Sequence, residues 1–268
     1  MSGGAGRARP SSGPTRPLGL IGSPSPKASP LYRLLRLFFG ALVNLLFRRE
    51  VVGLQNMPRT ADGEPAGGWI AVGLPHRTWV EFFVFLPLLP AEPRLVMLGD
   101  GPTMLGTRWR RVLLRRVGGV VPIWRGSGRR GFEAHLEAAH RTIAAGAVFG
   151  LFPEVGRAAR PPAMRRVSAS VAYFALRTGA PIVPFIFGGT HELYLRRRIV
   201  VRVLAPIPPR APAPAAGSAE EREAVVRLMA ELHAAIEPAV VAAHEASEPP
   251  SGTRKIARWL TGPYPQGD

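Results

Sequence analysis

The chain has 268 residues, of which 46% are hydrophobic, so it is long enough to bury a sizeable core in one large domain with appendages. Its 35 Lys and Arg residues and 18 Asp and Glu residues give a formal charge of +17, which favours an anionic partner. A membrane surface, a phosphorylated metabolite and nucleic acid all fit that charge. The lack of cysteine excludes disulfides, thiolate metal ligands and a cysteine nucleophile.

The N-terminal part of the chain divides by composition into two segments. Residues 1–29 are mostly Gly, Pro, Ser and Arg, which predicts a disordered basic tail. Residues 30–49 have a broad apolar face edged by arginines at helical spacing, which predicts an amphipathic helix at a membrane interface. The same pattern also suits a helix that packs against a core. Because no run of about 18 apolar residues predicts a spanning helix and no signal-peptide pattern is present, we expect a peripheral protein on the cytoplasmic face of a membrane.

Residues 50–207 alternate short apolar runs with helical patterns. This alternation predicts an α/β fold with a mostly parallel central sheet flanked by helices. The predicted strands are 69–74, 94–98, 119–123, 147–152, 181–187 and 199–204, and the predicted helices are 78–89, 108–116, 130–145 and 165–177.

The C-terminal part, residues 208–246, is expected to be a linker followed by a helix. Ser218 and Glu221 form a capping-box pattern at the start of that helix, and Pro238 is expected to end or kink it. Residues 247–268 are rich in Pro and Gly and are expected to form a flexible tail.

His76 follows the strand predicted at 69–74, at the edge where open α/β sheets bind ligands. A neutral imidazole there can take a proton from a hydroxyl group, and Glu81 is the nearest carboxylate that can orient the ring. Five helical positions are about 140° apart, so the two side chains meet only if His76 lies in the turn before the helix. Thr78 and Glu81 also form a capping box, so the carboxylate can be a cap, an orienting group or both. Taken alone, the pattern is more typical of an ordinary loop histidine.

Two other predicted strands end near an arginine. The segment Phe152-Pro153-Glu154-Val155-Gly156-Arg157 follows one strand, and Ile123-Trp124-Arg125 closes another. The planar guanidinium of arginine suits phosphate, and Gly156 lets the backbone approach a ligand closely. Each segment by itself is more typical of a turn with an exposed arginine. Together with His76 they indicate a site for a phosphate-bearing hydroxyl substrate beside a general base.

In order and spacing these blocks resemble the glycerolipid acyltransferases of the 1-acylglycerol-3-phosphate acyltransferase type. That family has His-x4-Asp, a strand ending in Ile-x-Arg, Phe-Pro-Glu-Gly-Thr-Arg and a Val-Pro strand. This chain has His76 with Glu81, then Ile123 to Arg125, Phe152 to Arg157, and Val183-Pro184. The resemblance covers roughly residues 50–207. The chain departs from it with Glu81 in place of Asp and with Val155-Gly156 in place of Gly-Thr.

The resemblance implies direct transfer of a fatty acyl group from acyl-CoA or acyl carrier protein to the hydroxyl of a lysophospholipid such as 1-acylglycerol-3-phosphate, in phospholipid biosynthesis. It implies that His76 is the general base and that Glu81 holds it. By the same resemblance, the acceptor-binding and pocket-shaping residues are Arg125, Glu154, Gly156, Arg157 and Pro184. No metal and no cofactor other than the acyl thioester substrate is implied.

Two alternatives remain at this point. The departures at Glu81 and Val155-Gly156 leave room for a family member that binds anionic lipid without turning it over, or that has another specificity. The arginine clusters 108–116 and 196–198 would also suit nucleic acid, but they are not interleaved with aromatic residues in a recognisable module. An anionic membrane makes the same electrostatic demand, so we expect a membrane partner and no nucleic acid.

Overall fold

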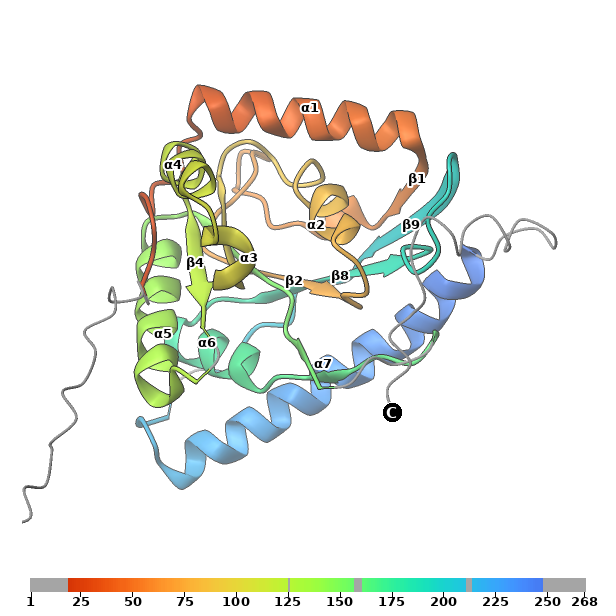
Figure 1. Ribbon diagram of the computed structural model, residues 1–268. Coiled ribbons are helices and arrows are strands. Elements are labelled where there is room, and N and C mark those ends of the chain that lie inside the picture. The colour runs from red at the N-terminus through yellow and green to blue at the C-terminus, as the bar shows by residue number, and fades with distance from the viewer. Residues whose placement is uncertain (1–18, 125, 157–160, 211–213, 248–268) are drawn as a thin grey trace, which may run out of the picture.

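The computed structural model describes residues 19–124, 126–156, 161–210 and 214–247. Within these ranges the core is a seven-stranded sheet in the order β1-β9-β8-β2-β5-β3-β4 (Figure 1). Neighbouring strands are parallel except β8 and β9, which are antiparallel. The strands are β1 (Phe47–Val52), β2 (Ile70–Leu74), β3 (Leu95–Asp100), β4 (Val120–Ile123), β5 (Val148–Leu151), β8 (Ile182–Gly188) and β9 (Arg197–Val203). The predicted α/β class with a mostly parallel sheet is confirmed.

Helices cover both faces of this sheet. On one face α1 (Pro30–Leu46) and α2 (Val80–Phe85) bury their apolar residues, and on the other face α5 (Gly128–Ala144), α6 (Ser170–Thr178) and α7 (Ala219–Ala246) do so. Figure 1 shows α1 lying across one side of the sheet and α7 along the other. The shorter helices η1 (Leu54–Asn56), α3 (Gly101–Leu105) and α4 (Arg108–Val117) lie in the connections between strands.

The burial of the central strands explains why they appear in the sequence as uninterrupted apolar runs. In β2, Ile70 and Leu74 point into the layer of α5 to α7, whereas Ala71 points into the layer of α1 and α2. All five residues of β2 are buried. A strand that is covered on both faces needs apolar side chains at every position, so it lacks the alternation of a half-exposed strand.

The helix predicted at 30–49 ends earlier than expected. It stops at Leu46, and the next six residues form β1, an edge strand that pairs in parallel with β9 from Phe47–Arg197 to Val52–Arg202. The residues of β1 are alternately less and more exposed, as in a strand covered on one side. The prediction was wrong because FRREVV lacks an apolar run, and the strand is defined by its pairing rather than by its composition.

Three other differences also arise from tertiary contacts. Within the segment expected to be disordered, Ile21 bonds to Val120 at the β4 edge, and Arg94 N donates to Pro26 O. Helix α6 begins at Ser170 rather than at residue 165, because residues 166–167 form a strand, β7. Helix α7 continues through Pro238 to Ala246, since its buried residues on both sides of the proline pack against the sheet and offset the lost backbone hydrogen bond.

Helix α1 is attached to the domain by only part of its surface. Ser29 caps it by accepting from Tyr32 N at 3.1 Å, and Arg36 donates to the carbonyl of Leu89 at 2.7 Å. Its exposed side carries several large apolar residues: Leu34, Leu37, Phe38 and Leu45. Among the described residues no helix has both the length and the apolar character needed to cross a bilayer.

Candidate active site

The site lies where two neighbouring parallel strands end. Strand β2 ends at Leu74 and β5 ends at Leu151, and the two strands are paired. The segments that follow them, containing His76 and Glu154, therefore meet at the same edge of the sheet. Strand β4 lies two places beyond β5 in the sheet, so its end is further from His76.

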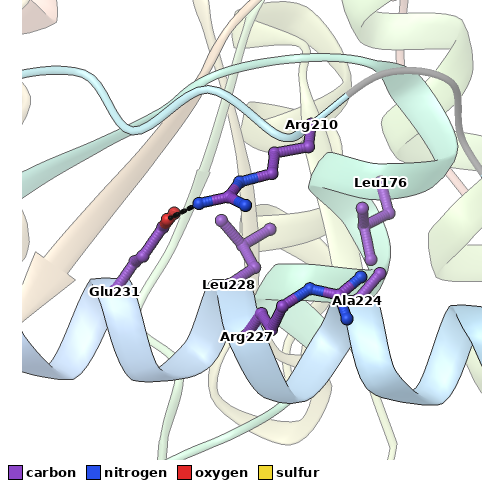
Figure 2. Close-up of a pocket in the computed structure, with 6 residues that line it drawn as sticks. All are labelled: Leu176, Arg210, Ala224, Arg227, Leu228 and Glu231. Carbon is purple, nitrogen blue, oxygen red and sulfur yellow. Dashed lines mark hydrogen bonds and ion pairs between the residues drawn. The ribbon is translucent and has the colours of Figure 1, made fainter.

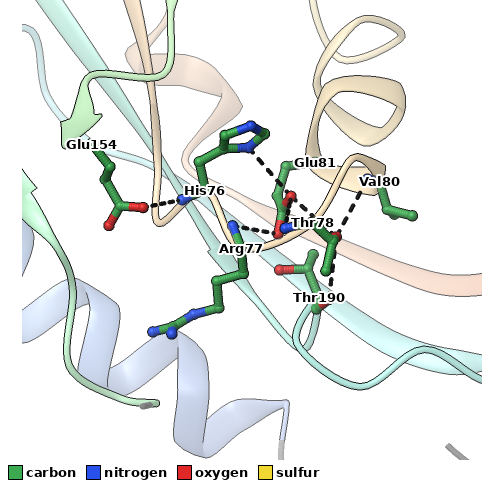
Figure 3. Close-up of polar contacts among 7 residues, drawn as sticks. All are labelled: His76, Arg77, Thr78, Val80, Glu81, Glu154 and Thr190. Carbon is green, nitrogen blue, oxygen red and sulfur yellow. Dashed lines mark hydrogen bonds and ion pairs between the residues drawn. The ribbon is translucent and has the colours of Figure 1, made fainter. Parts of the chain in front are cut away.

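His76 and Glu81 meet in the way that the sequence required. The histidine lies in the turn before α2, and its Nδ1 is 3.4 Å from Glu81 Oε2 (Figure 3). This separation suits an ion pair once the imidazole is protonated, but it exceeds a normal hydrogen bond, and Nδ1 has no partner of hydrogen-bond geometry in the described structure. Because Nδ1 faces Glu81, Nε2 lies on the opposite side of a ring that is 39% exposed.

Glu81 also holds the turn that precedes α2. The N-cap of the helix is Trp79, without a side-chain cap hydrogen bond, rather than Thr78 as the capping-box pattern predicted. Its carboxylate is fully buried and accepts hydrogen bonds from Thr78 N at 2.8 Å and Arg77 N at 3.2 Å. Thr78 Oγ1 lies 3.1 Å from the same carboxylate and 3.4 Å from the carbonyl of Thr190. One carboxylate therefore satisfies two main-chain donors in the turn before α2 and faces the imidazole, so Glu81 can both hold this turn and orient the ring.

The imidazole is held from one side by Phe152. The two rings are stacked with centroids 4.3 Å apart and planes inclined by 17°. Space for Phe152 depends on Gly73, because a Cβ added there would lie 2.2 Å from the phenylalanine Cε1. No role was predicted for Phe152, since nothing in a motif with one phenylalanine indicates that it contacts a histidine 76 positions earlier.

Glu154 contacts the main chain of the histidine segment. Its Oε2 accepts from His76 N at 2.7 Å (Figure 3). Its Oε1 accepts from Arg165 N at 3.1 Å. Burial raises the pKa of Glu154, while these two main-chain hydrogen bonds oppose the rise. The residue was predicted to bind substrate, and the structure adds that one of its oxygens holds the main chain of His76 and the other holds that of Arg165.

Two more residues that the sequence did not indicate complete this region. Arg77 Nη2 donates to the carbonyl of Ala163 at 2.8 Å, which connects the histidine segment to the segment after Glu154. Thr190 follows β8 and is 1% exposed, and its hydroxyl has no hydrogen-bond partner among the described residues. A single threonine after a strand belongs to no motif, so the sequence does not indicate that Thr190 lies beside His76 and Glu81.

The other predicted residues lie at different distances from this cluster. Gly156 follows Glu154 closely and has a φ of +95°, which favours glycine. Pro184 is buried within β8, paired with Val72, so it lies inside the sheet rather than at its edge. Arg125 and Arg157 lie outside the described residues.

Two cavities are found near the α5 to α7 layer. A groove of about 980 Å³ runs beside β7, and it is lined by arginines and by Phe132, Tyr173 and Ser168. The arginines are Arg129, Arg166, Arg177 and Arg222, and two carboxylates of the same lining, Glu133 and Glu221, pair with Arg129 and Arg177. The second cavity, shown in Figure 2, has about 20 Å³ between α6 and α7 beside the Arg210–Glu231 pair, which is room for about one water molecule. Within the described ranges no group of three His, Asp or Glu side chains is placed to hold a metal ion.

Comparison with known proteins adds the fold. No protein-family model and no curated protein matches the sequence. The structure matches the crystal structure of the 1-acyl-sn-glycerophosphate (LPA) acyltransferase PlsC from Thermotoga maritima, with a TM-score of 0.50. The chain has the fold of this acyltransferase. The match covers 77% of this chain and 80% of PlsC at 17% sequence identity. At this identity it establishes the fold alone, and the reaction has to be argued from the residues of the site.

Proposed function

We propose that the protein is an O-acyltransferase that moves a fatty acyl group from acyl-CoA or acyl carrier protein to the hydroxyl of a lysophospholipid such as 1-acylglycerol-3-phosphate. The observation that carries this proposal is the contact between His76 and the buried carboxylate of Glu81 at the end of β2. The PlsC fold supports the reaction class.

In the proposed reaction, His76 Nε2 accepts the proton of the acceptor hydroxyl while the hydroxyl oxygen attacks the thioester carbonyl carbon. The carbon–sulfur bond then breaks, and the thiolate leaves with the proton returned by the imidazolium. Glu81, 3.4 Å from Nδ1, stabilises the imidazolium while the proton is held there. The steps balance without an acyl-enzyme, a metal or a redox cofactor.

The acceptor is proposed to bind at the strand ends next to His76. Arg125 and Arg157 would bind its phosphate, Gly156 would allow close backbone approach, and Pro184 would shape the pocket from within the sheet. Glu154 would act beside the acceptor chiefly by fixing the His76 main chain, which its hydrogen bond of 2.7 Å supports.

The proposed location is the cytoplasmic face of a membrane with anionic lipids. Helix α1 supports it, because Leu34, Leu37 and Phe38 are each more than half exposed on a helix without acidic residues. A long-chain lysophospholipid resides in the same interface, so a peripheral enzyme meets its acceptor there.

A screen of acceptors tests this function. The purified protein is incubated with acyl-CoA or acylated carrier protein and a panel of lysophospholipids, and products are identified by mass spectrometry. We expect transfer to at least one phosphate-bearing lysolipid. Binding to anionic vesicles without any acylated product across the panel would contradict the proposal and support the non-catalytic lipid-binding alternative.

A further inference from the structure

Helix α4 is only partly covered by the rest of the molecule. None of its ten residues is buried, although half of them are hydrophobic. Trp109 is 62% exposed and Val112 is 51% exposed, and they lie three positions apart on one side of the helix. A helix that only connected two strands would normally bury such side chains, so this apolar side is available to a partner.

The other half of α4 is entirely arginine. All five arginines are exposed: Arg108, Arg110, Arg111, Arg115 and Arg116. In the part of the chain that the structure describes, none of them forms an ion pair with a carboxylate, and Arg110 lies 5.4 Å over the ring of Trp109. Arg108, Arg111 and Arg115 repeat at helical spacing beside the apolar stripe. The exposed surface of α4 therefore joins an apolar stripe to uncompensated positive charge.

This surface is continuous with α1. The two helices are in contact, and Val117 of α4 packs into the same apolar layer as α1. Figure 1 shows α4 beneath the N-terminal end of α1. Leu34 and Leu37, in the N-terminal half of α1, are exposed. Two exposed apolar faces without acidic residues thus adjoin on one side of the sheet.

We propose that α4 and the exposed face of α1 form a single docking surface for an anionic bilayer, with Trp109 and Val112 in the interface and the α4 arginines against lipid phosphates. The inference rests on the membrane location in the proposed function. The apolar residues favour a lipid interface, where tryptophan is enriched, and the unpaired arginines select an anionic one. A nucleic acid would account for the arginines but would leave the leucines of α1 exposed to water.

The electrostatic half is tested with Arg108→Gln/Arg115→Gln, measured by sedimentation with phosphatidylcholine vesicles that do or do not contain phosphatidylglycerol. An arginine near an anionic surface is worth about fivefold in partitioning, so the double variant should bind anionic vesicles roughly 25-fold more weakly. The matched control is Arg130→Gln/Arg141→Gln, two exposed arginines of α5 on the opposite layer, which should bind like wild type. Equal binding by wild type and the α4 variant, or an equal loss in the control, would overturn the proposal.

The apolar half is tested by a fluorescent label, which the absence of cysteine makes specific. An environment-sensitive probe on Val112→Cys should shift its emission to the blue when anionic vesicles are added, whereas a probe on Val226→Cys of α7, 68% exposed, should not. Membrane binding without a shift at position 112 would contradict the assignment. So would an α4 variant that loses affinity for an oligonucleotide while keeping its affinity for vesicles. These binding assays contain no acyl donor or acceptor, so they are independent of acyl transfer. A protein that binds vesicles through α4 but transfers no acyl group would disprove the proposed function without disproving the docking surface.

Discussion

At Glu81, one buried carboxylate meets both the main-chain N–H groups in the turn before α2 and the imidazole of His76. The sequence predicted that His76 and Glu81 could meet. It left the role of Glu81 open, because its position suits both a capping box with Thr78 and an orienting group for a histidine in the preceding turn. It did not predict that Phe152 stacks on His76 or that Glu154 accepts a hydrogen bond from His76 N, since both contacts depend on β2 and β5 being neighbours.

Replacing Glu81 separates its two roles. Glu81→Gln keeps one oxygen that can accept from Thr78 N, but its amide nitrogen then faces Arg77 N, so we expect the free energy of unfolding to fall by about 1–3 kcal/mol. The substitution also removes the charge that stabilises the imidazolium. The rate of acyl transfer should fall about 100-fold. Glu137→Gln, an exposed glutamate of α5, is the matched control. Full activity of Glu81→Gln would mean that the carboxylate only holds the turn before α2.

Gly73 sets the space for the ring that supports His76. Gly73→Ala would put a Cβ against Phe152, so we expect a loss of about 1–3 kcal/mol in the free energy of unfolding together with slower transfer. Denaturant unfolding and initial rates measure the two effects. Gly19→Ala, where no atom lies within 4 Å of the added carbon, should change neither. Wild-type stability and rate in Gly73→Ala would show that Phe152 is not held in this way.

At the scale of elements, the sequence predicted those strands and helices whose own residues carry the signal. Six strands of the large sheet, including the edge strand β4, were found because they are apolar runs. The edge strand β1 was missed because half of its six residues are charged. The end of α1, the start of α6 and the passage of α7 through Pro238 are decided by pairing and packing with distant segments, which no local pattern contains.

The contact between α5 and β4 makes stability depend on pH. His135 is 8% exposed and bonds through Nε2 to the carbonyl of Pro122, and burial lowers its pKa below the ordinary value of 6.5. The unfolded chain therefore binds this proton more readily, and the contribution of His135 to stability is lost as the pH falls below 6.5. Between pH 7.5 and 5 the free energy of unfolding of wild type should fall more than that of His135→Gln. Parallel curves would contradict this account.

At the scale of the whole molecule, the proposed docking surface lies on the side of the sheet that α1 covers, and α5 to α7 cover the other side. Substituting Leu34→Ser/Leu37→Ser should weaken vesicle binding without loss of stability, because both side chains are already more than 60% exposed. Transfer to a vesicle-borne acceptor should slow, whereas transfer to a soluble short-chain acceptor should not. Substitution is preferable to removal of residues 1–49, which would cut into β1. Unchanged vesicle binding would move the membrane contact elsewhere.

The central claim is that His76 is the general base, and the most direct measurement is the rate of acyl transfer from acyl-CoA to lysophosphatidic acid by wild type, His76→Ala and the control His140→Ala. His140 is an exposed histidine of α5 far along the chain from the site. The account predicts that His76→Ala lowers the rate by about 100-fold or more at unchanged thermal stability, while His140→Ala matches wild type. Equal rates for wild type and His76→Ala would contradict it.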